Sequence, residues 1–289
     1  MNMKKIQDPN DYYHLFINKQ INLQTLIEYL IAIIDKSEIL DQRITSIKLL
    51  NTLKLHDINV YRLIENTLAS DENYIIRALS FKYLLSNESH SASDILKWAI
   101  LNDPSTLFLR EVKKYLRSNE QAFILNIFDQ RIETLSQNLR LNSIEILFLI
   151  DLGLELNTVN LVLTNFEIYY IQAENLLIMI KDKRIRELNL VFNLEHIPES
   201  IENLTEIEVL NLSYNKLTKL PPTFKNLKNL KLLDLSWNEF VEIPGIIKNL
   251  PSLRTLNLDH NYIEEIREEV YPLMKKIDIS LANNPLNKK

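Results

Sequence analysis

The spacing of apolar residues divides the chain into two parts with different periods. Up to about residue 155, apolar residues recur at the spacing of amphipathic helices. Clear examples of such helical segments are residues 23–34, 58–68, 95–101 and 122–128. Beyond about residue 185, leucine and isoleucine alternate with polar residues in short runs, as in strands buried on one face. The pattern therefore predicts a helical domain over residues 1–155 and a strand-containing domain over residues 156–289.

The helical part is repetitive. Arginines that open similar apolar segments recur at intervals of 34, 33 and 30 residues, and these are Arg43, Arg77, Arg110 and Arg140. A turn-forming aspartate precedes three of them, and these are Asp41, Asp71 and Asp103. The predicted helices listed above lie between these segments. A repeat of this length built from two helices predicts an α-solenoid.

One copy is close to a known repeat pattern. The segment from Asp71 to Leu84 has an aspartate, then an aliphatic residue and Arg77, then a small residue and a leucine, and it resembles the core of a HEAT-type repeat. The resemblance covers about residues 10–150. It implies stacked helix pairs in which each arginine pairs with a turn aspartate of its own or the next repeat. A column of arginines that binds anions is the alternative hypothesis.

The second part contains a more specific pattern. A leucine or isoleucine opens each copy of L-x-L-x-x-N at spacings of 22, 23, 23 and 21, and these residues are Leu188, Leu210, Leu233, Leu256 and Ile277. This is the leucine-rich repeat pattern. The return segments, such as Leu220-Pro-x-x-Phe224, resemble the intracellular leucine-rich repeats of the Ras-associated group. The resemblance implies regular repeats over 185–287, a parallel sheet on a concave face, and protein binding on that face, small GTPases included.

Residues 156–184 form a degenerate cap ahead of the regular repeats. The run from Val159 to Asn165 fits either a degenerate first repeat or a β cap over the open end of the sheet. The segment 173–183 is predicted to be helical. The fold class is thus an α+β repeat protein, an α-solenoid of HEAT-like helix pairs followed by a leucine-rich repeat α/β solenoid.

The asparagine of each repeat is expected to be structural. In an L-x-L-x-x-N turn the side-chain amide can point inward and satisfy backbone groups that are removed from water. Stacking the repeats would align these amides in a ladder. The predicted ladder is Asn193, Asn215, Asn238, Asn261 and, in the last copy, Asn283 or Asn284, of which we take Asn284.

The residue before each of these asparagines is expected to lie on the concave side. In the first four copies this column consists of Phe192, Tyr214, Trp237 and His260. Exposed aromatic residues on a rigid sheet are typical anchors of protein interfaces. Asp234 is predicted on the same face, with Lys231 and Arg254 on a polar rim. The alternative hypothesis is that the rings only pack on one another across strands.

The amino-acid composition limits the kinds of catalytic and ligand-binding site that the chain can form. The chain has no cysteine and only two glycines, which excludes thiolate chemistry and glycine-rich phosphate loops. The five histidines, His14, His56, His90, His196 and His260, have no metal-ligand spacing. The sequence predicts no metal, no cofactor and no enzymatic activity. With no secretion signal or membrane-spanning stretch in it, we expect a cytoplasmic protein that does not bind membranes.

Net charge bears on the class of partner. The chain carries 33 Lys and Arg against 38 Asp and Glu, a formal charge of −5. Residues 1–155 carry 17 basic and 20 acidic residues, a net charge of −3, which argues against nucleic-acid binding. The sequence thus favours a non-enzymatic scaffold that binds a protein partner. The alternatives are a regulator of a small GTPase and, disfavoured by charge, a nucleic-acid-binding or nucleobase-processing HEAT-like protein.

Overall fold

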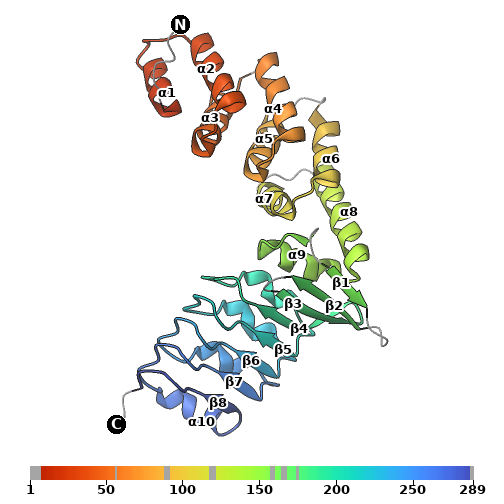
Figure 1. Ribbon diagram of the computed structural model, residues 1–289, viewed down its shortest axis with the longest axis vertical. Coiled ribbons are helices and arrows are strands. Elements are labelled where there is room, and N and C mark those ends of the chain that lie inside the picture. Colours follow the sequence, from red (N-terminus) through yellow and green to blue (C-terminus); the bar gives the residue numbers. More distant parts are fainter. Residues whose placement is uncertain are drawn as a thin grey trace. The chain divides into compact units, whose positions relative to one another are not determined.

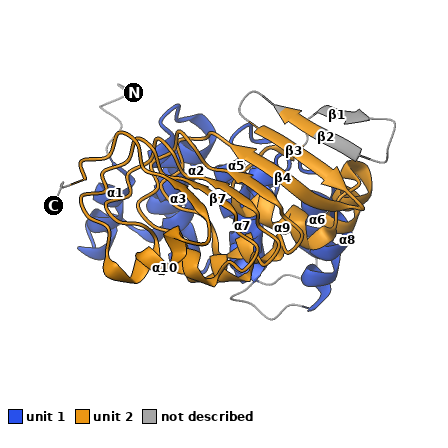
Figure 2. Ribbon diagram, turned by 90° about the horizontal axis from the view of Figure 1, so that it is seen from below, with its two compact units in different colours: residues 1–131 blue, residues 132–289 orange. Residues whose placement is uncertain are grey.

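The computed structural model describes residues 8–55, 57–87, 92–116, 122–156, 160–163, 168–173 and 176–286 (Figure 1). The chain forms two compact units, Met1–Arg131 and Ile132–Lys289 (Figure 2). The division falls inside helix α8 (Ala122–Leu139).

The first unit is helical. Its helices are α1 (Pro9–Ile17), α2 (Leu23–Lys36), α3 (Leu40–Leu53), α4 (Ile58–Ser70), α5 (Tyr74–Ser86), α6 (Ala92–Asn102) and α7 (Thr106–Leu116), followed by the first part of α8. Helix α2 packs on α3, and α4 on α5, while α5 also contacts α3 and α7. Polar side chains cap several helices; Asn73, for example, accepts a hydrogen bond from the amide of Ile75. The rings of Phe81 and Phe108 meet edge to face in the core, with centroids 5.9 Å apart.

Two of the repeated arginines join successive helix pairs. Arg43 on α3 forms an ion pair with Asp71, which precedes α5. Arg77 on α5 forms a two-pronged ion pair with Asp103, which precedes α7, with distances of 2.7 Å from Nε and 2.9 Å from Nη2. Each arginine thus reaches the turn aspartate of the next pair.

The other two arginines lie differently. The Nε atom of Arg110 is 3.5 Å from the carboxylate of the adjacent Glu111. Arg140 opens no helix: α8 continues well beyond the predicted end at residue 128, and Arg140 follows it in a left-handed turn with φ 51°. The next helix, α9, begins three residues later at Ser143. The long apolar stripe of α8, which includes Ile132 and Leu135, explains the extension.

The second unit contains α9 (Ser143–Asp151) and one mixed sheet with strands in chain order. The strands are β1 (Asn160–Leu163), β2 (Ile168–Ala173), β3 (Leu176–Lys181), β4 (Arg184–Leu190), β5 (Val209–Asn211), β6 (Leu232–Asp234), β7 (Thr255–Asn257) and β8 (Asp278–Ser280). Pairing is antiparallel from β1 to β4 and parallel from β4 to β8. Figure 1 shows the strands side by side in this order.

The predicted helix over 173–183 is wrong, because β3 occupies most of it. The β-branched residues Ile178 and Ile180 are buried and alternate with less buried positions, which is a strand pattern. Asp182 and Lys183 both have positive φ, 56° and 59°, and make the tight hairpin to β4. Of the two interpretations of Val159–Asn165, the β cap agrees with strand β1, although Val159, Thr164 and Asn165 lie outside the described residues.

Proline-led return segments connect the parallel strands. These are the short 3₁₀ helices η2 (Glu199–Asn203), η3 (Pro222–Asn226) and η4 (Gly245–Asn249), with η5 (Glu268–Val270) and α10 (Tyr271–Met274) before β8. Pro198, Pro221 and Pro244 stand at the N-caps of the first three. Each of these three helices buries one apolar side chain, such as Phe224 of η3.

The strand register differs from the prediction in the last copy. Leu188, Leu210, Leu233 and Leu256 lie in register, and the next residue of the row is Ile279 rather than Ile277. The last spacing is therefore 23 instead of 21. Ile277, Ile279 and Leu281 alternate, so two registers satisfy the L-x-L pattern.

The compact units divide earlier in the chain than the predicted boundary at residue 155. Helix α9 lies in the unit that contains the sheet. The amide of Asn142 donates to the carbonyl of Lys183 at 2.9 Å, and the Ser200 hydroxyl donates to Asp151 at 2.6 Å. These bonds attach α9 and its N-cap to the β3–β4 turn and to η2.

Candidate functional site

One face of the parallel sheet is open to solvent. Alternate residues of each strand, such as Leu210 and Leu233, are fully buried, and the residues between them point the other way. These intervening residues line the side of the sheet that we call the open face. Its first row is Glu187, Val209, Leu232, Thr255 and Asp278. Its second row is Asn189, Asn211, Asp234, Asn257 and Ser280.

Asp234 lies in the second row and also shapes the chain. Its Oδ1 accepts a hydrogen bond at 2.8 Å from the amide of Ser236, two residues later. Asn211 makes the same bond to the amide of Ser213 at 2.8 Å, and Asn257 to that of Asp259 at 3.0 Å. These are Asx turns that end the strands. The carboxylate of Asp234 is thereby held in a fixed orientation on the open face.

The asparagines after the strands form a bonded column. Asn238 donates from Nδ2 to the carbonyl of Leu212 in the preceding repeat at 2.8 Å, and its Oδ1 accepts from the amide of Leu217 at 2.9 Å. Asn215, Asn261 and Asn284 bond the preceding repeat in the same way. Asn284, rather than Asn283, holds this position in the last copy.

Three aromatic side chains beside this column stack on one another. The rings of Tyr214 and Trp237 have centroids 5.2 Å apart and an interplanar angle of 9°. Trp237 and His260 are 3.8 Å apart with an angle of 12°. Tyr214 is 57% exposed and Trp237 is 45% exposed. We call Tyr214, Trp237 and His260 the aromatic stack.

The backbone fixes the stack in place. Tyr214, Trp237 and His260 have positive φ values of 56°, 54° and 54°, which is uncommon for such residues. Their amides donate to carbonyls of the next repeat, as from Trp237 to Asp259 at 2.9 Å. At the end of the stack, Asn283 has the same conformation, φ 57°, and its Nδ2 lies 2.9 Å from Nε2 of His260.

Phe192 and Asn193 lie outside these two columns. The first copy has one residue fewer between Leu190 and Leu194 than the next has between the equivalent Leu212 and Leu217. As a result the exposed Asn193, with φ 59°, takes the left-handed conformation, whereas the amide of Phe192 donates to Asn215. Phe192 is exposed, and among the described residues its ring joins no stack.

The charge of the predicted polar rim is partly neutralised. Lys231 pairs with Glu208, and this hydrogen bond is the main cause that lowers the pKa of Glu208. Arg186 pairs with Glu206 at 3.0 Å. Arg254 is exposed and donates from Nη1 to the carbonyl of Leu253 at 3.0 Å.

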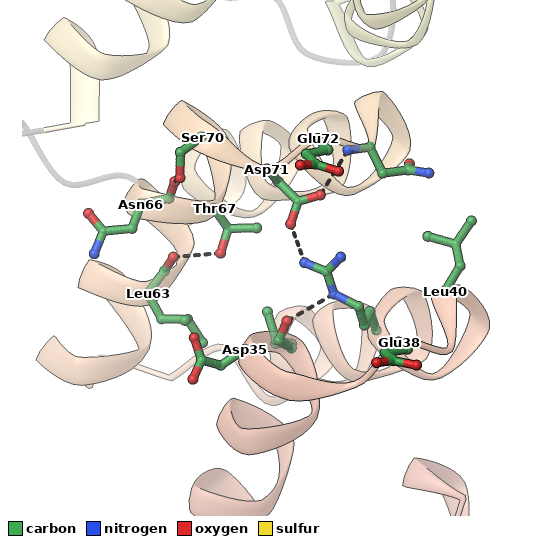
Figure 3. Close-up of a pocket in the computed structure, with 12 residues that line it drawn as sticks. Asp35, Glu38, Leu40, Leu63, Asn66, Thr67, Ser70, Asp71 and Glu72 are labelled. Carbon is green, nitrogen blue, oxygen red and sulfur yellow. Dashed lines mark hydrogen bonds and ion pairs between the residues drawn. The ribbon is translucent and has the colours of Figure 1, made fainter.

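The helical unit contains a separate polar pocket of about 500 Å³ among α2, α3, α4 and the turn before α5 (Figure 3). Asp71 lies at its centre, paired with Arg43, and also accepts a hydrogen bond from the amide of Asn73 at 2.9 Å. Nε of Arg43 donates to the carbonyl of Ile34 at 2.9 Å. The central charges thus serve contacts between successive helix pairs, and no histidine is among the residues that line the pocket.

The described residues include no cluster of His, Asp and Glu that could hold a metal ion. His56 and His90 lie outside the described residues. In the part of the chain that the structure describes, every helix is too short or too polar to cross a bilayer.

Comparison with known proteins agrees with the repeat architecture. Residues 183–240 and 218–263 match the family described as "Leucine rich repeat". These residues contain strands β4 to β7. The chain therefore carries a leucine-rich repeat region preceded by helices. No curated protein matches the sequence.

Several solved structures are similar over part of the chain. InlP of Listeria monocytogenes is 34% identical, with a TM-score of 0.27 and 32% of this chain covered. The protein LIC12759 of Leptospira interrogans is 27% identical, with a TM-score of 0.30 and 36% covered. The leucine-rich repeat domain of APL1B is 25% identical, with a TM-score of 0.31 and 34% covered. The matches span 24%, 32% and 31% of those chains, respectively.

Proposed function

We propose that this protein is a non-enzymatic scaffold or adaptor that binds a protein partner on the open face of its leucine-rich repeats. The partner's main contact is the aromatic stack, and the predicted residues Phe192, Asp234, Lys231 and Arg254 provide further contacts. Leucine-rich repeat regions generally use an extended solenoid surface to bind other proteins.

The exposure of the aromatic stack is the observation that carries this proposal. Trp237 contacts a ring on each side and is still 45% exposed, so half of a large rigid side chain faces water. Aromatic residues of this kind concentrate binding energy at interfaces because they bury a large area at a small cost in side-chain entropy. The stacking that orders the rings in the free protein lowers that cost further.

For the helical unit we propose a HEAT-like solenoid that extends the scaffold. Two observations support it, the ion pair of Arg43 with Asp71 and that of Arg77 with Asp103, each between successive helix pairs. The proposal includes no nucleic-acid partner and a cytoplasmic location. A small GTPase is a candidate partner within the same scheme, as the resemblance to Ras-associated repeats suggests.

The test removes the rings without disturbing the backbone. Asparagine tolerates positive φ, and Asn283 already occupies this position in the last repeat. A Tyr214→Asn, Trp237→Asn variant should keep its melting temperature within a few degrees and lose partners captured from native extract by affinity purification and mass spectrometry. Tyr262→Asn is a matched control, because Tyr262 is 60% exposed and lies outside the stack.

Three outcomes would contradict the proposal. Retention of every partner by the double variant would move the site away from the stack. Loss of the same partners in a Lys225→Ala, Lys248→Ala variant, with retention by the double variant, would place the site on the return segments. A lowered melting temperature with unchanged binding would support the alternative that the rings only pack on one another.

A further inference from the structure

The charged side chains on the open face are all acidic. Asp259 accepts a hydrogen bond from the hydroxyl of Ser280 at 2.5 Å, so it lies beside the second row. Together with Asp259, the two rows of the open face hold four carboxylates and no lysine or arginine. We call these carboxylates, Glu187, Asp234, Asp259 and Asp278, the acidic strip.

The acidic strip has no cationic partner within the described residues. Asp234 accepts hydrogen bonds from the amide and hydroxyl of Ser236, and Asp259 from the amide of Ala282 at 2.7 Å. These donors are neutral, so the two side chains are oriented but their charge is not compensated. The polar rim differs, because Lys231 pairs with Glu208, and Arg186 beside it pairs with Glu206. The other rim cation, Arg254, donates to the carbonyl of Leu253.

The acidic strip and the aromatic stack are adjacent. Asp259 directly precedes His260, and its backbone carbonyl accepts a hydrogen bond from the amide of Trp237 at 2.9 Å. A partner side chain that pairs with Asp259 therefore lies against the rings. Lysine and arginine suit this position, because a long aliphatic stem covers apolar surface while the charged head reaches a carboxylate.

The dimensions favour an extended segment over a small amine. The strip runs from β4 to β8, which are four strand spacings apart, or about 19 Å at about 4.8 Å each. An extended chain covers that length with about six residues. Between the carboxylates lie Val209 and the 37% exposed Leu232, which suit apolar side chains of the same segment.

We infer that the open face binds an extended protein segment in which basic side chains alternate with apolar ones. The basic side chains pair with Asp234 and Asp259, and the aliphatic stems and apolar side chains pack on the aromatic stack and Leu232. The inference rests on the proposed function and specifies the chemistry of its partner.

Fluorescence polarisation with the full chain tests the pairing directly. The probes are a fluorescein-labelled peptide of alternating arginine and leucine and a matched peptide of glutamate and leucine. The wild type should bind only the basic peptide. An Asp234→Asn, Asp259→Asn variant should bind it about tenfold more weakly, since it loses two charge pairs at half-buried carboxylates. Asn211 and Asn257 form the same Asx turn in their repeats that Asp234 forms in its own, so asparagine at position 234 preserves this turn. The variant should therefore fold normally.

The control variant Glu264→Gln, Glu265→Gln removes the same charge from exposed residues outside the strip. Its affinity for the basic peptide should equal that of the wild type. Equal weakening of both variants would show attraction by overall charge and overturn the inference, as would unchanged binding by the Asp234→Asn, Asp259→Asn variant.

A display library of random peptides, selected on the wild type, separates the inference from the proposed function. Enrichment of arginine and lysine that disappears on the Asp234→Asn, Asp259→Asn variant supports the inference. Enriched peptides that are not basic but still need Tyr214 and Trp237 overturn it and leave the proposed function standing. Peptides that bind the Tyr214→Asn, Trp237→Asn variant equally well contradict both, and so does the absence of any enrichment.

Discussion

Glu145 and Arg184, 39 positions apart in the chain, form an ion pair in which Nε lies 2.9 Å from Oε1. The second carboxylate oxygen of Glu145 accepts the amide of Ile185 at 3.0 Å, and the side chain is fully buried. Helix α9 is thus attached to the first strand of the leucine-rich repeat region by a buried carboxylate.

The attachment of α9 to β4 predicts where the folded leucine-rich repeat region begins in the chain. A fragment of residues 140–289 keeps α9 and its bonds to the sheet, whereas a fragment of 156–289 exposes the apolar surface that α9 covers. The longer fragment should give a cooperative thermal transition by circular dichroism, and the shorter should melt lower or aggregate, because an uncapped solenoid end is unstable. Equal melting of the two fragments would show that α9 adds nothing, and would favour a boundary near 155.

Glu145 also predicts a pH dependence. Burial raises the pKa of Glu145 above its ordinary value of 4.5, against the opposing effects of Arg184 and the Ile185 amide. The folded protein then holds this proton to higher pH than the unfolded chain does. The contribution of Glu145 to stability is therefore largest below pH 4.5 and falls as pH rises through the folded pKa.

Urea unfolding at several pH values would measure this effect. In a Trp98→Phe background, Trp237 is the only tryptophan and reports on the repeat unit. The Glu145→Gln variant should lack the fall in stability that the parent shows. Glu208→Gln provides the opposite sign, because the pKa of Glu208 is lowered and its contribution is lost as pH falls. Parallel pH profiles for the parent and Glu145→Gln would contradict the prediction.

The asparagine ladder predicts an asymmetry between two asparagines of neighbouring repeats. Asn238 is 4% exposed and satisfies carbonyls and an amide within the turns. Its replacement by alanine should lower the free energy of unfolding by about 1–3 kcal/mol, since buried backbone groups lose their partner. The side chain of Asn226 donates to the exposed Glu202 at 2.8 Å, so Asn226→Ala should cost little. Equal losses in urea unfolding would contradict the buried role of Asn238.

In the helical unit, burial distinguishes two ion pairs of the same kind. Arg77 and Asp103 are 8% and 3% exposed in their side chains, whereas Arg43 is 20% exposed and Asp71 is 10% exposed. Arg77→Leu leaves a buried carboxylate unpaired and should cost about 3–5 kcal/mol. Arg43→Leu should cost less, because water can reach Asp71. Thermal unfolding followed by Trp98 fluorescence in a Trp237→Phe background would rank the stability losses of the two variants. A larger loss for Arg43→Leu would show that burial does not determine how much these ion pairs contribute to stability.

Backbone conformation at Trp237 predicts the outcome of two substitutions. Valine resists positive φ because its branched Cβ crowds the backbone, and Trp237→Val should lose about 1–3 kcal/mol. Trp237→Asn should lose less, although it removes the same stacking with Tyr214 and His260. Urea unfolding followed by circular dichroism compares them without a tryptophan signal. Equal stability of the two variants would show that stacking, rather than backbone strain, dominates at this position.

The regular repeats were the most predictable part of the fold, because each copy of L-x-L-x-x-N repeats a local pattern. The sequence placed Tyr214, Trp237 and His260 in one column, and the structure brings their rings together. The sequence wrongly placed Phe192 in the same column. The spacing from Leu188 to Asn193 does not reveal that this copy lacks one residue before Leu194.

Features that depend on distant residues could not be predicted. Glu145 gives no local signal for its role, since its partner lies on strand β4. Strand β3 lies in a short apolar run that fits both the alternation of a strand and the periodicity of a helix. Only its pairing with β2 and β4 decides in favour of a strand. The Asx turn of Asp234 was missed as well, although Asn211 and Asn257 at the equivalent positions were a usable signal.

The left-handed position at the end of each regular strand has an evolutionary consequence. Tyrosine, tryptophan, histidine and asparagine stand there in successive repeats with φ values between 54° and 57°. The same backbone accepts four chemically different side chains. A lineage could therefore alter what this surface recognises by single substitutions, one repeat at a time, while the scaffold that presents them passes unchanged from ancestor to descendant.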